Sequence, residues 1–219
     1  MRQTTAPEQA SRRLRIALIG GGLVLALLVG IGIYGLLRGP APTPEPIPNA
    51  ATATPDSRPN LAPRELPAST TPERFARNVA EGLFAWDTGL GYGSQEYMQA
   101  IVDVADRDEA PGLTADLRAY FPDDDAWAEL RHYATRQWLT IDTIAVPGSW
   151  AGIVADARPG TLPPGATAYT ITGTRHRAGV WEGQDVIDSR PVSFTIFGAC
   201  PDDGGCRLLR LSAVDTPLR

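Results

Sequence analysis

The sequence predicts an α+β protein in which a single N-terminal transmembrane helix and a proline-rich linker precede one domain. Three observations lead to this prediction: an uncharged apolar run of 22 residues, a stretch dense in proline, and a change from helical to alternating periodicity near Gln137. The domain is expected to hold three to four helices followed by a four-stranded antiparallel sheet. The predicted segments are a basic tail at 1–15, a membrane helix at 16–37, a linker at 38–70 and the domain at 71–219.

The apolar run begins at Ile16 and ends at Leu37. At about 1.5 Å per residue it is long enough to cross the hydrocarbon core of a bilayer. Four arginines precede the run, and Arg38 alone follows it before a neutral stretch. The excess of positive charge before the span predicts a cytoplasmic N-terminus and an extracytoplasmic domain, as in a single-pass protein of the cell membrane.

A cleaved signal peptide is the alternative interpretation of this run. The apolar part of a signal peptide is normally about 7–15 residues and is followed directly by a site of small residues. The nearest such site, at 51–53, lies far downstream. A retained anchor is therefore favoured. Within this anchor, the small residues Gly22, Ala26 and Gly30 are spaced by four. This spacing is typical of close helix packing and makes the three residues a candidate helix-packing contact.

The linker holds ten of the twenty prolines, between Pro40 and Pro72. Proline at alternate positions favours an extended backbone, and the stretch has no periodic apolar face. It is expected to act as a spacer, either as a stalk of required length or as a tolerated tether.

The remaining residues are enough for one domain with its own core. From Pro72 to Arg219 there are 21 Asp and Glu against 13 Arg, a formal charge of −8. This charge repels the phosphates of nucleic acid, so direct nucleic-acid binding is not expected. All basic residues are arginine, which carries no mechanism by itself.

Helix signals open the domain. Thr70, Pro72 and Glu73 are typical of a helix start, and apolar residues at three- and four-residue spacing predict a helix that continues to about Trp86. Three further helices are expected from Ser94 to about Ala105, around Leu113 to Tyr120 before Pro122, and after Asp123 as cap.

Strand signals follow. The segments at about 137–146, 168–177, 185–200 and 206–214 are rich in β-branched and apolar residues, and a Gly- and Pro-rich loop separates the first two. Cys200 and Cys206 flank a Pro-Asp-Asp-Gly-Gly turn sequence on the predicted outer side of the membrane, which indicates a hairpin closed by a disulfide. Two thiols without a nearby third ligand are too few for structural zinc.

If the two cysteines lie opposite each other, large apolar residues occupy both faces of this hairpin. Such a sheet face, when exposed, is usually an interaction surface. Either the face is exposed, or the loop at 147–165 or a bulge that changes the register covers it. The candidate interface consists of Phe194, Ile196 and Leu208 on one face and Phe197, Leu209 and Leu211 on the other.

Residues for catalysis are few. His132 and His176 show no titrating partner at a useful spacing and are interpreted as ordinary histidines. The acidic residues at 103–109 lack the spacing of a calcium loop, and those at 123–125 suit a helix N-terminus. Arg175, Arg177 and Arg190 form either an acceptor for an acidic partner or, as favoured, ordinary pairs with Asp185 and Asp188. No metal, cofactor or catalytic residue is predicted.

The segments FARNVAEGLFAWDTGLGYGSQEYMQAI and GLTADLRAYFPDDDAWAELRHYATRQWLTIDTIAVPGSW, with the anchor and linker before them, resemble the TcpC-like bridging subunits of type IV secretion and conjugative elements. The resemblance implies a domain similar to nuclear transport factor 2, a cone of helices on a curved antiparallel sheet. It covers about half of the domain and rests on packing and turn residues. Several Gram-positive relatives have two such domains, whereas this chain has one.

The resemblance implies a non-enzymatic assembly subunit of a conjugative transfer or secretion apparatus that acts through protein contacts. Its expected partners are the membrane, other subunits of the complex and possible further copies of this chain. Two alternatives stay open. One is an accessory membrane protein of a lipid importer, similar to the Mce-associated proteins, and the other is a small-molecule-binding or enzymatic domain that uses the cone as a pocket.

Overall fold

The computed structural model describes residues 61–219. The predicted basic tail, the membrane helix with its Gly22, Ala26 and Gly30 stripe, and most of the linker lie outside this part. Within 61–219 no helix has both the length and the apolar character needed to span a bilayer.

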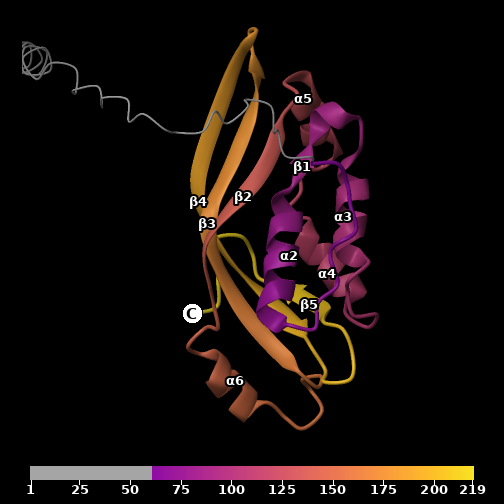
Figure 1. Ribbon diagram of the computed structural model, residues 1–219, viewed down its shortest axis with the longest axis vertical. Coiled ribbons are helices and arrows are strands. Elements are labelled where there is room, and N and C mark those ends of the chain that lie inside the picture. Colours follow the sequence, from indigo (N-terminus) through magenta and orange to yellow (C-terminus); the bar gives the residue numbers. More distant parts are fainter. Residues whose placement is uncertain (1–60) are drawn as a thin grey trace, which may run out of the picture. The chain divides into compact units, whose positions relative to one another are not determined.

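The described part has the predicted α+β architecture, with helices packed on one antiparallel sheet (Figure 1). The sheet has five strands in the order β1-β2-β3-β4-β5, each antiparallel to its neighbour. Its strands are β1 Trp86–Asp87, β2 Arg136–Ala145, β3 Ala166–Trp181, β4 Gln184–Ala199 and β5 Arg207–Leu211. The α-helices are α2 Pro72–Phe84, α3 Ser94–Val102, α4 Ala110–Leu117, α5 Asp124–His132 and α6 Trp150–Asp156.

Helix α2 begins at Pro72, as predicted, after the N-cap residue Thr71. Its apolar stripe is buried, but the helix ends at Phe84, two residues before the predicted end. Trp86 instead belongs to the short strand β1 and pairs with Gln137 of β2. The sequence analysis missed this strand because two residues carry no periodicity.

The other helix starts show which capping signals are reliable. Asp123 caps α5 as predicted, since its Oδ1 accepts a hydrogen bond of 2.8 Å from the Ala126 N–H. Ser94, however, is the first helical residue of α3 and not its cap. The cap is Gly93, whose N–H donates to Glu96 Oε2 at 2.9 Å, so the acidic side chain supplies the capping bond.

The core lies between the sheet and helices α2 to α5. Three aromatic rings meet at its centre: Phe84 of α2, Tyr120 after α4 and Phe194 of β4, with ring centroids 5.4–6.0 Å apart. Burial raises the pKa of Tyr120, whose hydroxyl donates to the Ser212 carbonyl at 2.8 Å. These rings fill the space that a hollow cone would leave open.

An irregularity in the pairing of β2 with β3 bends the sheet. The register between β2 and β3 shifts between Ile141 and Thr143, which leaves Asp142 as an extra residue. Opposite this shift is Gly173, where a Cβ would clash with the Thr140 carbonyl. Glycine therefore permits the close approach of two backbones at the bend.

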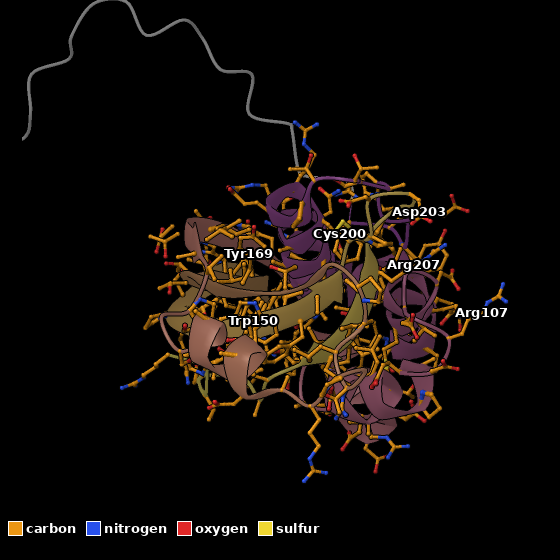
Figure 2. All side chains as sticks on the ribbon, turned by 90° about the horizontal axis from the view of Figure 1, so that it is seen from below. Arg107, Trp150, Tyr169, Cys200, Asp203 and Arg207 are labelled. Atoms are coloured by element: carbon orange, nitrogen blue, oxygen red, sulfur yellow. A yellow bond between two sulfur atoms is a disulfide. The ribbon has the colours of Figure 1, made fainter. Side chains whose placement is uncertain are left out.

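Helix α6 lies on the face of the sheet that α2 does not cover (Figure 2). Its Trp150 ring is 6.1 Å from the Phe197 ring, while the rest of this short helix is mostly exposed. The sequence predicted a loop at 147–165, because the seven residues of α6 form too few turns to show an apolar stripe. The C-terminal segment covers the same face: Leu218 donates to Thr195 Oγ1 and accepts from Thr170 Oγ1, both at 2.8 Å.

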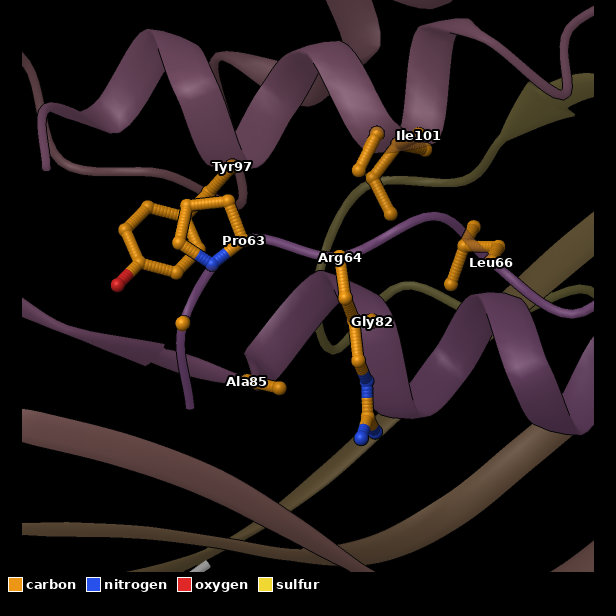
Figure 3. Close-up of a pocket in the computed structure, with 9 residues that line it drawn as sticks. Pro63, Arg64, Leu66, Gly82, Ala85, Tyr97 and Ile101 are labelled. Atoms are coloured by element: carbon orange, nitrogen blue, oxygen red, sulfur yellow. The ribbon is translucent and has the colours of Figure 1, made fainter. Parts of the chain in front are cut away.

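The chain before α2 packs in an extended form across α2 and α3. Leu66 crosses α2 at Gly82, where a Cβ would lie 2.6 Å from the Leu66 side chain. Pro63, Arg64 and Tyr97 border a hollow of about 20 Å³ at this crossing (Figure 3). That volume accommodates about one water molecule and no larger ligand.

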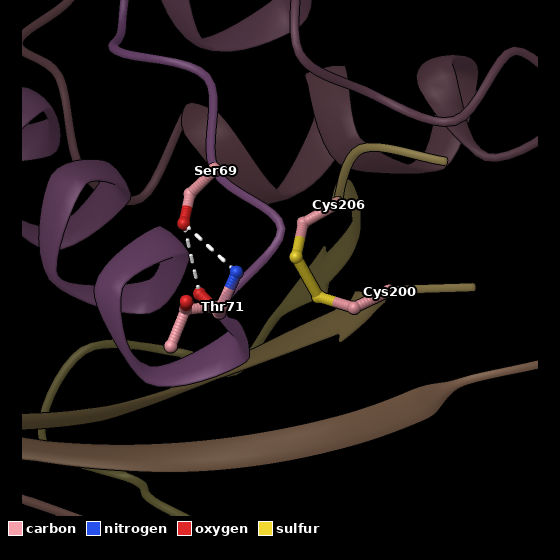
Figure 4. Close-up of a disulfide and its surroundings, with 4 residues drawn as sticks. All are labelled: Ser69, Thr71, Cys200 and Cys206. Atoms are coloured by element: carbon pink, nitrogen blue, oxygen red, sulfur yellow. Dashed lines mark hydrogen bonds between the residues drawn. A yellow bond between two sulfur atoms is a disulfide. The ribbon is translucent and has the colours of Figure 1, made fainter. Parts of the chain in front are cut away.

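A disulfide joins Cys200 and Cys206, as the sequence predicts (Figure 4). Its surroundings tie three separate parts of the chain together. The Cys200 N–H donates to the Gly165 carbonyl before β3, and the Cys206 N–H donates to the Ser69 carbonyl before α2, both at 2.9 Å. The bridge therefore holds the end of β4 and the start of β5 beside the N-terminus of α2.

Candidate protein-interaction surface

Strands β3 and β4 continue beyond the helices as a two-stranded arm, defined here as residues 178–187 (Figure 1). β2 ends opposite Ala178, so the arm has no further strand beside it. Glu182 and Gly183 form its turn with φ of 49° and 76°. Positive φ at both central residues of a two-residue turn is typical of type I′, whose twist matches that of paired strands.

The arm exposes large apolar side chains on both of its faces. The exposed fractions are 42% for Val180, 52% for Trp181, 48% for Val186 and 68% for Ile187. Val180 and Ile187 lie on one face and Trp181 and Val186 on the other, so both faces of the arm carry large exposed apolar groups on an otherwise acidic domain. Such a surface is typical of a contact site for another protein.

The β3 side of the arm is fixed to Tyr133, the residue that follows α5. The Val180 N–H donates to the Tyr133 carbonyl at 2.8 Å, and the rings of Tyr133 and Trp181 stack with centroids 5.0 Å apart and 25° between planes. A Cβ at Gly179 would lie 2.9 Å from the same carbonyl, so glycine allows this approach. The arm is thus held in one direction before any partner binds, which lowers the entropy that binding must overcome.

Hollows lie on both sides of the arm base. One of about 230 Å³ is lined by Tyr133, Arg177 and Trp181 among others. The second, of about 480 Å³, is lined by Leu90, Arg136 and Ile187 among others. Side chains of a partner that contacts both faces of the arm can enter both hollows.

The outer edge of β4 is open along the arm. In a two-residue hairpin the residues next to the turn form a hydrogen-bonded pair, so Asp185, Ile187 and Ser189 direct their N–H groups away from β3. Farther along, Ser193 and Thr195 have the same orientation, and their N–H groups donate to Asp215 Oδ1 and Ser212 Oγ.

Within residues 61–219 no such acceptor faces the earlier three N–H groups. The fourth outward position on this stretch is Pro191, which has no N–H to leave unpaired. We call residues 184–191 the free β4 edge.

Arginines occupy the helix-facing side of the sheet next to this edge. Arg177 donates from Nε to Gln137 Oε1 at 2.8 Å and lies 5.4 Å from the centre of the Trp86 ring. Burial lowers the pKa of Arg177, and the charge of Arg175 adds to this shift. Gln137 Nε2 and Trp86 Nε1 are buried without a hydrogen-bond partner.

Arg175 and Arg190 face each other across β3 and β4. Arg190 forms a 3.0 Å ion pair with Asp188 on its own strand, whereas the favoured interpretation of the sequence placed such pairs across the sheet. Arg175 has no hydrogen bond or ion pair with any residue of 61–219. The expected pairing of Arg177 with an aspartate is replaced by its contacts with Gln137 and Trp86, because β2 lies beside it.

The residues of the predicted hairpin interface lie in other places. Phe194, Ile196, Leu208 and Leu211 are buried in the core, and Phe197 and Leu209 are half-buried. The assignment of Leu211 to the outer face is wrong. Phe197 pairs with Arg210 and Gly198 with Leu208, so Leu209 is an extra residue that returns Leu211 to the core face. The alternative of a covered face is the one that the structure shows, with α6 and the C-terminal segment as cover.

The two histidines differ in their surroundings. His132 is exposed at the end of α5. His176 stacks on Trp138 at 5.1 Å, and its Nδ1 and Nε2 lie 2.8 Å and 3.0 Å from the hydroxyls of Ser189 and Thr140. The Ser189 and His176 separation is that of a nucleophile and base. The third group is a hydroxyl instead of a carboxylate, and the three side chains lie on an open sheet face, which offers no enclosed substrate position.

The acidic groups have local structural roles. Asp103 Oδ1 accepts from Gln99 Nε2 at 2.7 Å, and Asp106 Oδ1 accepts from the Asp108 N–H at 3.0 Å. Among the described residues, no three His, Cys, Asp or Glu side chains come together as a metal site. Asp116 instead binds Arg210 through two bonds of 2.7 and 2.9 Å and so ties α4 to β5.

The arm was missed by the sequence analysis, although signals for it exist. Glu182-Gly183 lies between two apolar segments, Ala-Gly-Val-Trp and Val-Ile, which is a hairpin pattern. Its exposure depends on where β2 and β5 end, which local periodicity does not record. Comparison of the chain with protein-family models, with curated proteins and with solved structures finds no match for any of its residues.

Proposed function

We propose that this chain is a non-enzymatic, membrane-anchored assembly subunit whose domain acts through contacts of the β3–β4 arm with another protein. The observation that supports this proposal most directly is the arm itself, with exposed Val180, Trp181, Val186 and Ile187 on a fixed hairpin. Isolated apolar residues on a surface need no explanation, but a hairpin with large exposed apolar groups on both faces does.

The setting of the proposal is a conjugative transfer or type IV secretion apparatus, with the domain outside the membrane. Its basis is the resemblance of the sequence to TcpC-like bridging subunits and the excess of arginine before the apolar run. Helices followed by a bent antiparallel sheet are compatible with the nuclear transport factor 2-like fold of that family.

A pocket enzyme is the less favoured function for this domain. Phe84, Trp86 and Phe194 fill the space between the helices and the sheet and are essentially inaccessible to solvent. Enzymes of this fold need an interior that admits substrate, with polar groups that converge on it. The hollows of the arm are open and bordered by large apolar groups instead.

The arm hypothesis predicts a functional loss without unfolding. Ile187→Glu places a charge in the proposed contact, which an apolar partner surface cannot solvate. In the native host we expect transfer or secretion to be lost, and crosslinks from a photoreactive residue at position 181 to disappear. Circular dichroism should show an unchanged fold, because the side chain is exposed in the isolated domain.

The matched control is Ile153→Glu on α6, an exposed isoleucine on the helix that lies at the other end of the domain from the arm (Figure 1). This variant should keep full activity and full crosslinking at 181. If Ile153→Glu abolishes activity and Ile187→Glu does not, α6 is the contact surface and the arm proposal is wrong. Protease added to wall-stripped cells tests the topology, since an extracytoplasmic domain should be removed.

A further inference from the structure

We propose that the partner of the arm is an acidic segment in extended conformation that adds to the free β4 edge as a sixth strand. This inference rests on the proposed function, since it specifies the partner of the same arm. It combines two features that lie side by side: a row of open backbone donors and three arginines on the helix-facing side of β3 and β4, where Asp188 is the acid among them.

The backbone part of the site has a defined length. Outward N–H groups at Asp185, Ile187 and Ser189 alternate along the edge, and Pro191 ends the row. Three such positions pair with a segment of about five to seven residues, or about 17–24 Å of strand. The turn at Gly183 precedes this stretch, and the hydrogen bonds between Ser193 and Asp215 follow it. These two features limit the length of the open edge.

The electrostatic part selects the charge of the segment. Like charges directly opposite each other on a sheet are destabilising, yet Arg175 faces Arg190. Arg177 lies on the same side two residues along, and Asp188 is the acid that faces it. A carboxylate on a sixth strand, beside Arg190, lies within reach of the long Arg175 side chain from β3 and reduces the repulsion.

The acidic tip of the arm argues against a membrane as the occupant. Glu182 and Asp185 flank the exposed Trp181 and Val186, and a bilayer with anionic lipids repels such a tip. A peptide strand instead places its side chains along the edge toward the arginines and leaves the tip in water.

The test uses the full-length chain in detergent and two synthetic heptapeptides. One peptide alternates valine with glutamate, and the other has lysine in place of each glutamate. Amide hydrogen exchange is followed by mass spectrometry. We expect the glutamate peptide to slow exchange at 185–189 and to bind about tenfold more tightly than the lysine peptide at low salt, with the difference reduced to about twofold in 0.5 M salt.

Two pairs of variants assign the effect to the edge and to the arginines. Ser189→Pro removes an outward N–H in a position equivalent to that of Pro191, whereas Ser189→Ala removes only the hydroxyl, which contacts His176. The proline variant should lose binding about tenfold more than the alanine variant. Arg175→Gln should weaken the glutamate peptide about fivefold, and Arg207→Gln, on exposed β5 surface, should leave binding unchanged.

Equal binding of both peptides, or no protection at 185–189 with either, overturns the proposal. Protection at 185–189 that rises with protein concentration in the absence of peptide also overturns it and makes a second copy of this chain the occupant. These failures are separate from failure of the proposed function. If Ile187→Glu abolishes activity and crosslinks while the peptides do not bind, the arm is a protein contact of different chemistry.

Discussion

The two halves of strand β4 have opposite surroundings although they belong to one continuous strand. In the C-terminal half, from Val192 to Ala199, β5 and the segment after it cover the edge, and helices cover the face. In the N-terminal half every residue from Gln184 to Pro191 is exposed. Both halves carry isoleucine, yet Ile196 is 2% exposed and Ile187 is 68% exposed. Residue type alone therefore does not determine which half contributes to stability and which to binding.

The comparison implies that the covered half of β4 mainly stabilises the fold and that the open half mainly presents a binding surface. The covered half has the aromatic core, the disulfide and the Asp116–Arg210 pair, each of which links β4 or β5 to a helix or a loop. The open half has the exposed Arg190–Asp188 ion pair and the contact of Ser189 with His176. Its partner strand β3 is held to Tyr133 by one stacked ring pair and one backbone bond. An exposed group of large apolar side chains is typical of an interaction site.

The largest expected difference between the halves is in the response to the same substitution. Ile196→Ala should lower the free energy of unfolding by about 2–5 kcal/mol, because it leaves a cavity among packed rings. Ile187→Ala should change it by less than about 0.5 kcal/mol. Urea denaturation of both variants measures the two changes in the free energy of unfolding. Similar losses in both would mean that the arm is part of the cooperative core.

The disulfide provides a second, smaller test on the covered half. Replacing Cys200 and Cys206 by serine should lower stability by less than about 3 kcal/mol, since the bridge closes a loop with a sequence separation of only 6. The protein should still fold. Alkylation under non-reducing denaturation should label neither thiol in the wild type, and exchange of arm amides should be unaffected by the double substitution. Faster exchange at 178–187 in that variant would contradict the independence of the two halves.

The Asp116–Arg210 pair predicts a pH dependence confined to the covered half. Burial opposes ionisation of Asp116, but hydrogen bonds from Arg210 and from the Leu211 N–H outweigh it and lower the pKa. A lowered pKa stabilises the fold above the unfolded-state value of about 3.9, and this stability is lost as pH falls through the folded-state value. Asp116→Asn should therefore cost about 1–2 kcal/mol at pH 7, with Arg210 half-exposed, and progressively less as pH falls below about 3.9.

A thermal melting series from pH 3 to pH 7 measures this difference. Asp203→Asn is the control, because Asp203 is exposed and has no ion pair in 61–219. A constant difference between the Asp116 variant and wild type across the whole range would show that the amide is destabilising for steric reasons and not through charge.

The sequence predicted the covered half better than the open one, for physical reasons. The Asp123 cap, the α2 stripe and the cysteine hairpin depend on residues within a few positions of each other, and each is confirmed. The outer position predicted for Leu211 failed because the bulge at Leu209 is set by the pairing of β5 with β4, which the alternation of residues along β5 does not record. The membrane helix and most of the linker lie outside the described residues and stay predictions.

The site was harder to predict than the fold because exposure depends on absent neighbours. Val186 and Ile187 have the same pattern as a buried strand, and only the end of β2 at Arg136 and the short length of β5 leave them uncovered. The three arginines were found as a group from their spacing. Their register, with Arg175 opposite Arg190, depends on the two-residue turn at Glu182, which fixes every pair along the hairpin.

The smallest expected effect separates the two halves most clearly, because removal of a charge should change the free energy of unfolding in opposite directions in the two halves. In the covered half, loss of a charge at Asp116 destabilises the fold. In the open half, Arg175→Gln should raise the free energy of unfolding by about 0.2–1 kcal/mol at low salt, since it removes the repulsion with Arg190. The gain should disappear in 0.5 M salt, which screens charges at this separation.

Asp188→Asn is the matched variant for this prediction, because it removes the ion pair with Arg190 and leaves three arginines together. It should lower stability by a similar amount under the same low-salt conditions. Chemical denaturation at two salt concentrations measures the change in the free energy of unfolding for both variants. If Arg175→Gln is destabilising at low salt, the guanidinium stabilises the free domain, and a partner's carboxylate is no longer needed to explain why two arginines face each other at an open edge.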